Sequence, residues 1–378
     1  TNMLARAFSK LRPAGTLHTW GDTSFRILGH HEEKPFLLPT QVLYSSRGDR
    51  LPSLIKVTTG PTHFAAITSE GNLVTAGFNE FGELGFEDRL ETGPIVVPEF
   101  GDVVDVACGF QFTIAVNNKG KVYTWGRPGG FKGFLGLANG LKVPSVLGYA
   151  AADAVKTPKY VAALKKDKIV QVAAGKNHAL ALSDSGAVFA WGDNSLGACG
   201  VTSEASIEKP TPITFFETLG QKVKRVVASG EHSAAITEQG QVFVWGSNAY
   251  GQLAAGEDVK FQPIPKELNS FEYTRVILGN TTLMVQTHDG QLGVAGMKLW
   301  PLLSPFDTPK PAKAAVCGHD YFAALLEDGS FIHFNAAFGQ HKPTGSLSGS
   351  IEQTGAGFLG GEVLELEGAY NYSAAVVA

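Results

Sequence analysis

Three histidines occupy one position of an internal repeat, and they are the first candidates for chemistry in this chain. His63, His178 and His232 each stand three residues after the glycine or serine that begins a repeat unit. An imidazole can serve as a general base, a metal ligand or a hydrogen-bond partner. Catalysis or metal binding would require such groups to converge on one point, whereas a ring of repeats spaces them around it. We therefore expect structural hydrogen bonds that tie adjacent strands.

Cysteines and one His/Glu cluster are the other candidates for chemistry. Cys108, Cys199 and Cys317 show no CxxC motif and no spacing typical of Cys/His zinc ligands. Cys108 and Cys317 directly precede the first glycine of a unit, which predicts small buried thiols in a reducing compartment. Residues 30–33 read His-His-Glu-Glu, but adjacent side chains cannot easily chelate one ion. The sequence therefore assigns no metal ligands.

Common catalytic signatures do not occur in the sequence. There is no P-loop, no GxSxG, no HExxH and no paired zinc-ligand motif. We expect a protein that is not an enzyme, with no catalytic residues and no cofactor.

The elements that position these side chains belong to seven similar units. Their first residues, the repeat heads, are Gly60, Gly109, Gly175, Ser229, Gly279, Gly318 and Gly368. Eleven residues after each of the first six heads stands a second glycine, the turn glycine: Gly71, Gly120, Gly186, Gly240, Gly290 and Gly329. Polar residues followed by glycine are typical of a type I turn closed by a left-handed residue. Each unit therefore predicts a tight hairpin, and the head glycines predict close backbone packing near a central axis.

The seventh unit is divided between the two ends of the chain. Gly368 is followed by ten residues, and the missing half, Gly15-TLHTW-Gly21, stands near the N-terminus with the spacing that the other units show. Self-similarity at a fixed period indicates a propeller or a solenoid. Because the first strand completes the last unit, the sequence predicts a closed ring: an all-β, seven-bladed propeller in one domain over residues 14–378.

Four tryptophans share one position, immediately before the glycine that closes a unit: Trp20, Trp125, Trp191 and Trp245. Since they share a register, we expect them to act as structural wedges between blades. Trp300 alone stands outside this register, which disfavours a light-sensing cluster of tryptophans.

The composition favours protein partners over nucleic acid. Charged residues make up 17% of the chain and the net charge is −4, whereas a binder of phosphate backbones needs clustered Lys and Arg. A low charge density suits a surface embedded among partners. No apolar run approaches the roughly 18 residues that a membrane span needs.

Two long segments interrupt the repeat, and we expect both to be rim insertions: residues 22–54 and 127–168. The second has helical propensity at Tyr149-AAADAV and again from Lys159 to Lys168, with Pro158 between them. A helical excursion on one rim is a candidate partner-binding element. Its candidate contact residues are Phe131, Phe134, Tyr149, Tyr160, Lys165 and Lys166. A surface loop without a partner is the alternative.

Residues 1–13, TNMLARAFSKLRP, precede the ring. Leu4, Phe8 and Leu11 fall on one helical face beside basic residues, and the first acidic residue of the chain is Asp22. Basic amphipathic segments of this kind are typical of mitochondrial transit peptides or of their remnants. The expected location is mitochondrial and otherwise cytoplasmic.

The repeat as a whole resembles that of the regulator of chromosome condensation family. The pattern V-x-x-V-x-x-G-x-x-H-x-x-x-L-x-x-x-G-x-V-x-x-W-G-x-N-x-x-G-Q-L is clearest over residues 223–253 and 169–197, and it recurs over 55–85 and 104–136. The other three copies are degenerate. The resemblance implies seven blades of four antiparallel strands, closed by pairing of the terminal strands. It does not imply one function, because members include exchange factors for small GTPases, chromatin binders, light receptors and assembly factors.

Two functions remain open from the sequence. The first is a non-catalytic scaffold or assembly subunit, plausibly mitochondrial, whose partners are other protein subunits of a large complex. The alternative is a guanine-nucleotide exchange factor for a small GTPase, which requires no chemistry of the propeller itself. A chromatin or light-sensing role is less favoured.

Overall fold

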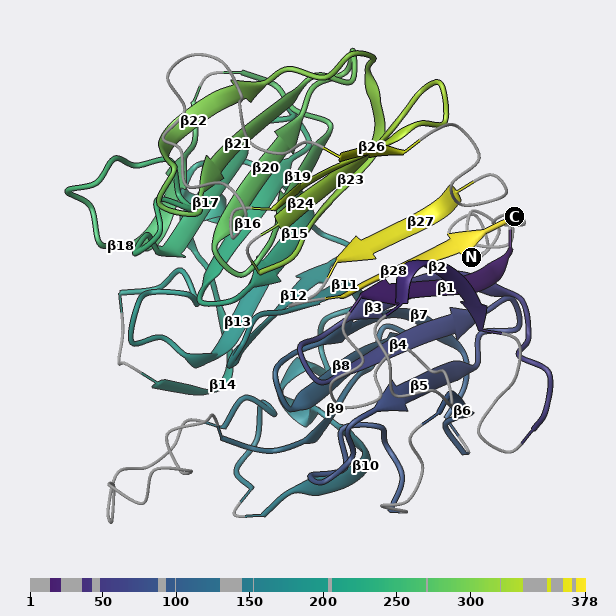
Figure 1. Ribbon diagram of the computed structural model, residues 1–378. Coiled ribbons are helices and arrows are strands. Elements are labelled where there is room, and N and C mark those ends of the chain that lie inside the picture. The colour runs from purple at the N-terminus through teal and green to yellow at the C-terminus, as the bar shows by residue number, and fades with distance from the viewer. Residues whose placement is uncertain are drawn as a thin grey trace.

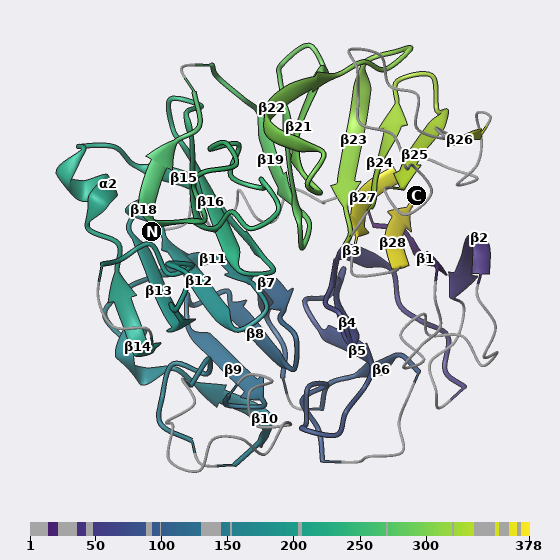
Figure 2. The same cartoon turned by 60° about the vertical axis from the view of Figure 1, so that its left-hand side comes forward.

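A computed structural model of the protein describes residues 14–21, 36–42, 48–87, 93–98, 100–129, 145–151, 153–202, 206–269, 271–319, 321–335, 352–354, 363–368 and 372–378. These residues form seven four-stranded antiparallel sheets. Figure 2 shows the sheets following one another around a centre in the order of the chain. The predicted seven-bladed propeller is therefore confirmed.

Each blade is numbered by its place along the chain. Blade 1 contains β3 Leu54–Thr59, β4 His63–Thr68, β5 Leu73–Gly77 and β6 Ile95–Val96; blade 2 contains β7 Val103–Cys108, β8 Phe112–Asn117, β9 Val122–Gly126 and β10 Val155–Tyr160. Blade 3 contains β11 Ile169–Ala174, β12 His178–Ser183, β13 Val188–Asp193 and β14 Ser206–Pro212; blade 4 contains β15 Val223–Ser229, β16 His232–Thr237, β17 Val242–Ser247 and β18 Phe261–Glu267. Blade 5 contains β19 Arg275–Leu278, β20 Thr282–Gln286, β21 Leu292–Gly296 and β22 Trp300–Phe306; blade 6 contains β23 Ala312–Cys317, β24 Tyr321–Leu326, β25 Phe331–Asn335 and β26 Glu352–Thr354. Blade 7 contains β27 Val363–Gly368 and β28 Tyr372–Val377 from one end, with β1 Thr16–Gly21 and β2 Phe36–Val42 from the other.

Blade 7 closes the ring by joining the two ends of the chain. Strand β1 pairs with β28 in an unbroken antiparallel register from Thr16↔Val377 to Gly21↔Tyr372. Strand β2 completes the sheet on the outer side of β1, and Figure 1 shows these strands side by side. The closure predicted from the divided repeat is confirmed.

The inner strands β3, β7, β11, β15, β19, β23 and β27 contact one another in sequence around the axis, and β27 contacts β3. The second strand of each blade lies between the first and third strands of the same sheet. It is buried along its whole length in β4, β12, β16 and β24. Its small and apolar residues, as in His178-ALALS, let neighbouring blades approach on both faces.

The two ends of the ring differ in their connections. At the turn face, the second and third strands meet at turn glycines, and Gly71, for example, adopts a φ of +83° that only glycine enters without steric cost. At the opposite end, the head face, the loops after the repeat heads meet the longer connections to the outer strands. The predicted hairpin turns are confirmed.

Several outer strands carry prolines. They are Pro39 in β2, Pro158 in β10, Pro210 and Pro212 in β14, Pro263 and Pro265 in β18, and Pro301 and Pro305 in β22. Proline donates no backbone hydrogen bond and is tolerated where no further strand is added.

The segments expected to be rim insertions supply regular outer strands. Strand β2 lies within residues 22–54 and β10 within 127–168. The helical expectation for the second segment is wrong, because Val155–Tyr160 forms a strand and only a short 3-10 turn, η3 Ala162–Leu164, follows it. Pairing of β10 with the edge of β9 outweighs the local propensity.

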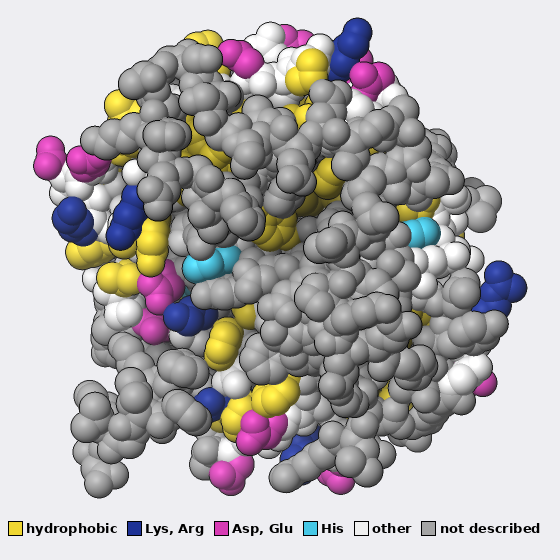
Figure 3. All heavy atoms as spheres, in the orientation of Figure 1, with side chains coloured by type: hydrophobic (Ala, Val, Ile, Leu, Met, Phe, Trp, Pro, Cys, Tyr) yellow, Lys and Arg dark blue, Asp and Glu magenta, His cyan; other side chains and the backbone are white. Residues whose placement is uncertain are grey.

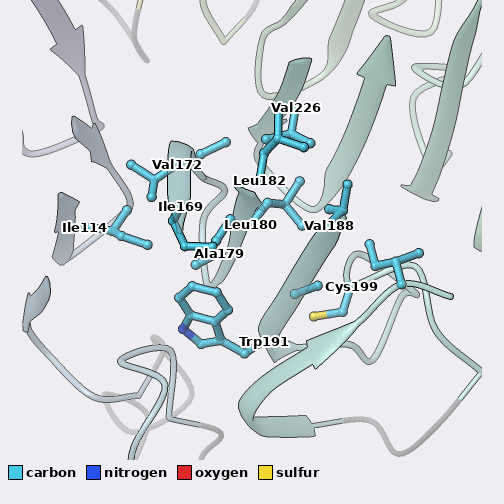
Figure 4. Packing of buried hydrophobic residues seen from close by; sticks show 14 of the residues in the cluster. Ile114, Ile169, Val172, Ala179, Leu180, Leu182, Val188, Trp191, Cys199 and Val226 are labelled. Atoms are coloured by element: carbon cyan, nitrogen blue, oxygen red, sulfur yellow. The ribbon is translucent and has the colours of Figure 1, made fainter. Parts of the chain in front are cut away.

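Hydrophobic packing runs between blades. The largest core cluster spans blades 2 to 4, and Figure 4 shows Trp191 beneath Ile169 and Ala179, with Ile114 and Val226 reaching in from the neighbouring blades. Burying one such indole removes about 150–250 Å² of surface from water. Across blades 2 to 4, the core is therefore continuous from one blade to the next.

Helices contribute little to the described residues. They include η3 and the four-residue α2 Phe215–Thr218. No helix in this part of the chain is long and apolar enough to cross a membrane.

Candidate functional site

A chain of hydrogen bonds joins blade 1 to blade 2 and accounts for His63. Its Nε2 atom lies 2.8 Å from the hydroxyl of Thr113. That hydroxyl donates to the backbone carbonyl of Glu83 at 2.7 Å, and the indole of Trp125 donates to the same oxygen at 2.8 Å. The Thr113 hydroxyl donates its hydrogen to the Glu83 carbonyl, so its oxygen accepts a hydrogen bond from His63. The imidazole proton therefore lies on Nε2.

The same arrangement joins blade 3 to blade 4. His178 Nε2 lies 2.8 Å from the Ser233 hydroxyl, which donates to the Ala198 carbonyl at 2.8 Å. Trp245 donates to that carbonyl at 2.9 Å. Trp191 makes the corresponding indole bond from blade 3 to the Val146 carbonyl of blade 2, at 2.8 Å.

The blade 4 to blade 5 junction lacks this arrangement. Leu283 stands where Thr113 and Ser233 stand elsewhere, and Ala295 replaces the indole. His232 is fully buried, and within the described residues neither ring nitrogen makes a hydrogen bond. Apolar packing, including Leu253, Leu283 and Val285, holds this junction.

Burial keeps the three repeat histidines neutral. It lowers the pKa of His63 and of His232 to about 3 and that of His178 to about 4. The three rings lie at separate junctions, and no group of three or more possible metal ligands occurs among the described residues. Trp125, Trp191 and Trp245 are likewise completely buried between blades; the side chain of Trp20 lies outside the described residues.

The repeat heads pack where an added methyl group would collide with a neighbouring strand. A Cβ on Gly60 would lie 2.7 Å from the Gly109 carbonyl oxygen, and one on Gly279 would lie 2.2 Å from that of Gly318. At Gly175 it would meet the His178 ring, and at Gly368 the Cys317 carbonyl. Glycine is thus required by the close approach of adjacent inner strands at Gly60, Gly279 and Gly368, and by the imidazole of its own blade at Gly175.

Buried thiols occupy the cysteine positions. Cys108, Cys199 and Cys317 are free and buried, and burial raises the pKa of the Cys199 and Cys317 thiols. A raised pKa leaves a thiol unreactive.

The inner strands enclose an axial cavity of about 780 Å³. Its middle is walled by small residues such as Ala107, Cys108, Ala173 and Cys317. One end of the cavity has a different lining. Near the turn face, the lining includes Lys56, Gln171, Arg225, Arg275 and Lys313.

The head-face mouth of the cavity is ringed by loops that bond to one another. Phe110 N–H donates to the Lys176 carbonyl at 3.2 Å, and Lys176 N–H donates to the Gly230 carbonyl at 2.6 Å. Farther round, Thr281 donates its hydroxyl to the His319 carbonyl at 2.6 Å. Lys176 also lies 3.8 Å from Glu231 of the next blade. These bonds hold the loops in fixed positions relative to one another.

The structure describes four of the six predicted partner-binding residues: Tyr149, Tyr160, Lys165 and Lys166. Phe131 and Phe134 lie outside the described residues, as do residues 1–13. Tyr149 is half-buried and donates to the Thr124 carbonyl at 3.0 Å, and burial raises its pKa to about 12. Tyr160 is also half-buried, against Tyr123 at a ring-centre distance of 5.7 Å. Both rings therefore support blade 2.

Lys165 and Lys166 are exposed at the turn face, on the connection from blade 2 to blade 3. Strand β10 runs away from the head face, since Val155 pairs with Gly126 and Tyr160 with Tyr123. These lysines thus lie at the opposite end of the blade from residues 127–129, where the loop containing Phe131 and Phe134 begins. In Figure 3, acidic and basic side chains alternate with hydrophobic ones around the visible face.

Sequence reasoning missed the charged residues of the inner strands and the buried carboxyl of Glu83. Glu83 lies in the head-face loop of blade 1, completely buried, and its Oε2 accepts from the Phe81 N–H at 2.9 Å. Burial raises its pKa to about 8. Gln252 makes the corresponding bond to Tyr250 in blade 4, at 2.8 Å. An alignment of the two loops would have shown that blade 1 has the carboxyl of Glu83 where blade 4 has the amide of Gln252.

Comparison with known proteins agrees with this geometry. The chain is 30% identical over 320 residues to the mouse secretion-regulating guanine nucleotide exchange factor, covering 79% of this chain and 64% of that protein. It is 31% identical over 251 residues to the Arabidopsis thaliana ultraviolet-B receptor UVR8, covering 65% of this chain and 52% of the receptor. The chain thus spans roughly half to two thirds of the length of these relatives.

Solved structures share the architecture. Prp20p of Saccharomyces cerevisiae, a protein studied for its binding to Gsp1p and histones, superimposes with a TM-score of 0.78 at 22% identity, covering 98% of this chain and 93% of Prp20p. The RCC1-like domain profile matches residues 16–303. The chain belongs to the RCC1-like domain family.

Proposed function

We propose that this propeller promotes guanine-nucleotide exchange on a small GTPase. The observation that carries the proposal is the 30% identity to the secretion-regulating exchange factor across 79% of this chain. The structure is compatible with it, because exchange requires a binding surface and no catalytic group of the propeller. A partner that binds the nucleotide-free GTPase more tightly than the GDP-bound form must weaken GDP binding by the same factor.

The head face is the better candidate for the contact. Its connections between the third and outer strands are long, whereas the turn-face hairpins are tight. Loops on a rigid scaffold commonly carry binding residues. Lys176 and Glu231 stand on neighbouring head-face loops that are fixed by backbone bonds, so a change of charge there alters the surface without disturbing the core.

The direct test is release of a fluorescent GDP analogue from a panel of purified small GTPases. We expect the full chain to accelerate release from at least one of them. Glu231→Lys should weaken the acceleration, while Lys165→Glu with Lys166→Glu, on the turn face, should leave it unchanged. Failure to accelerate release from any GTPase in the panel would refute the proposal.

A scaffold function has one observation in its favour. Phe261 and Ile264 on β18 are 47% and 37% exposed, and Leu302 on β22 of the next blade is 59% exposed. Exposed apolar side chains on outer strands can support protein contacts. If they hold the protein in an assembly, Phe261→Asp with Leu302→Asp should reduce its native mass in cell extracts. The mitochondrial location stays a prediction.

A further inference from the structure

One repeat position forms a ring near the turn-face end of the axial cavity. This position, four residues before the repeat head, is occupied in blades 1 to 6 by Lys56, Asp105, Gln171, Arg225, Arg275 and Ala314. In five of these blades a β-bulge interrupts the pairing of the inner strand at this residue, and in blade 7 the corresponding bulge falls at Glu365. A bulge re-aims a side chain, and five of the six residues line the cavity.

Three members of the ring have structural partners. Lys56 forms an ion pair with Asp105 of the next blade. The other carboxylate oxygen of Asp105 accepts from the Val172 N–H at 2.9 Å. Gln171 bonds both backbone groups of Val226, each at 3.0 Å. The Asp105 and Gln171 side chains thus satisfy open backbone groups of the following inner strand.

Arg225 and Arg275 have no such role among the described residues. Both are exposed, line the cavity in adjacent blades, and make no ion pair or side-chain hydrogen bond in this part of the structure. Lys313, in the next blade, also lines this end. The described lining residues include no Asp or Glu. Arg225 and Arg275 therefore form a pair of exposed cations on adjacent blades at this end of the cavity.

We propose that this end of the axial cavity binds a small molecule carrying two or more phosphate groups. Two guanidinium groups offer paired N–H donors that match phosphate oxygens. The whole axial cavity, of which the proposed site is the turn-face end, has a volume of about 780 Å³, within the range of small-molecule sites. Small wall residues beyond the arginines, such as Ala173 and Ala228, leave room for the body of the ligand. The site is separate from the head face and independent of nucleotide exchange.

Calorimetric titration of the full chain with inositol hexakisphosphate, and separately with pyrophosphate, tests the proposal. We expect both probes to bind at physiological ionic strength. Arg225→Gln with Arg275→Gln should weaken binding of the hexakisphosphate at least tenfold. Lys165→Gln with Lys166→Gln removes the same charge from the turn face outside the cavity and should change the affinity less than twofold.

Two further measurements keep the result unambiguous. Ala314→Glu places a carboxylate in the same ring without removing an arginine, and it should also weaken binding at least tenfold; thermal melting establishes that each variant is folded. The proposal is overturned if neither probe binds, or if the lysine and arginine pairs lose affinity equally. Tighter binding of a poly-glutamate peptide than of either phosphate probe would also overturn it, and would assign the site to an acidic protein segment.

Discussion

The Nε2 atom of His63 and the hydroxyl of Thr113 lie 2.8 Å apart across the junction of two blades. His178 and Ser233 repeat the relationship two blades farther on. In both pairs, the hydroxyl donates a hydrogen bond to a backbone carbonyl oxygen. The same oxygen also accepts a hydrogen bond from a tryptophan indole N–H. The histidine and tryptophan of the repeat thus act on one interface, although each belongs to a different blade.

Removing the Thr113 hydroxyl should destabilise the protein. Thr113→Val keeps the shape of the side chain, but it removes one acceptor from the buried Nε2 of His63 and takes one donor from the Glu83 carbonyl. An unsatisfied buried polar group costs about 1–3 kcal/mol. Chemical denaturation should show a loss of that size in the free energy of unfolding.

Thr282→Val provides the matched control. The Thr282 hydroxyl is buried, and within the described residues it has no hydrogen-bond partner. The same substitution should therefore be neutral or stabilising there. Equal losses at both positions would mean that the bond to His63 contributes nothing.

Replacing Glu83 with glutamine should remove a pH dependence of stability. Burial raises the pKa of this carboxyl to about 8, with Glu80 acting in the same direction and Arg127 and local backbone bonds opposing it. In the unfolded chain the carboxyl titrates near pH 4.5, so between these values the folded state holds the extra proton. Stability from this group is complete below about pH 4.5 and is lost as the pH rises through 8.

Glu83→Gln should be more stable than the original protein at pH 9, by at most about 5 kcal/mol. Gln252 demonstrates that an amide makes the required bond at this loop position. Melting temperatures of the two proteins should converge toward pH 5 and diverge toward pH 9. A difference that does not vary with pH would exclude ionisation of Glu83 as its cause.

The architecture was accessible from the sequence because the repeat fixes it at several levels. Turn glycines at constant spacing locate the hairpins, and the half unit at Gly15–Gly21 determines how the ring closes. The outer strands were harder to recognise. In β10, the local sequence favours a helix interrupted at Pro158. The segment forms a strand because it can pair with the free edge of β9.

The chemistry of the cavity could not be read from the repeat in the same way. Arg225 and Arg275 look like ordinary surface cations in the sequence, and their placement depends on a bulge at Arg225 and on the start of β19 at Arg275. Similarly, only comparison with the Gln252 loop of blade 4 distinguishes Glu83 from Glu80 in the sequence. The first is completely buried and the second exposed, because the loop folds back beneath its own backbone.

Substituting the head glycine of blade 1 should be costly. A Cβ at Gly60 would lie 2.7 Å from the Gly109 carbonyl oxygen and 2.9 Å from the Cys108 Cβ, so two inner strands would have to separate. Overpacking of this kind costs about 1–3 kcal/mol. Gly101→Ala is the control, because its nearest contact would be 3.4 Å from the Asn72 side chain. Thermal unfolding should show a lower melting temperature for Gly60→Ala alone.

Deleting the closing strand should destabilise the whole ring. A chain lacking residues 1–20 loses nearly all of β1, and with it the pairing to β28 and the buried side chain of Leu17. Truncating a single buried leucine costs about 2–5 kcal/mol, and the deletion also opens the strand edge. A chain lacking residues 1–13 keeps β1 and is the control. The shorter protein should melt at a clearly lower temperature than the control and should aggregate more readily. If the two truncated proteins melted at the same temperature, the hydrogen-bonded closure of blade 7 would not stabilise the ring. The packing of the inner strands around the axis would then hold the ring together.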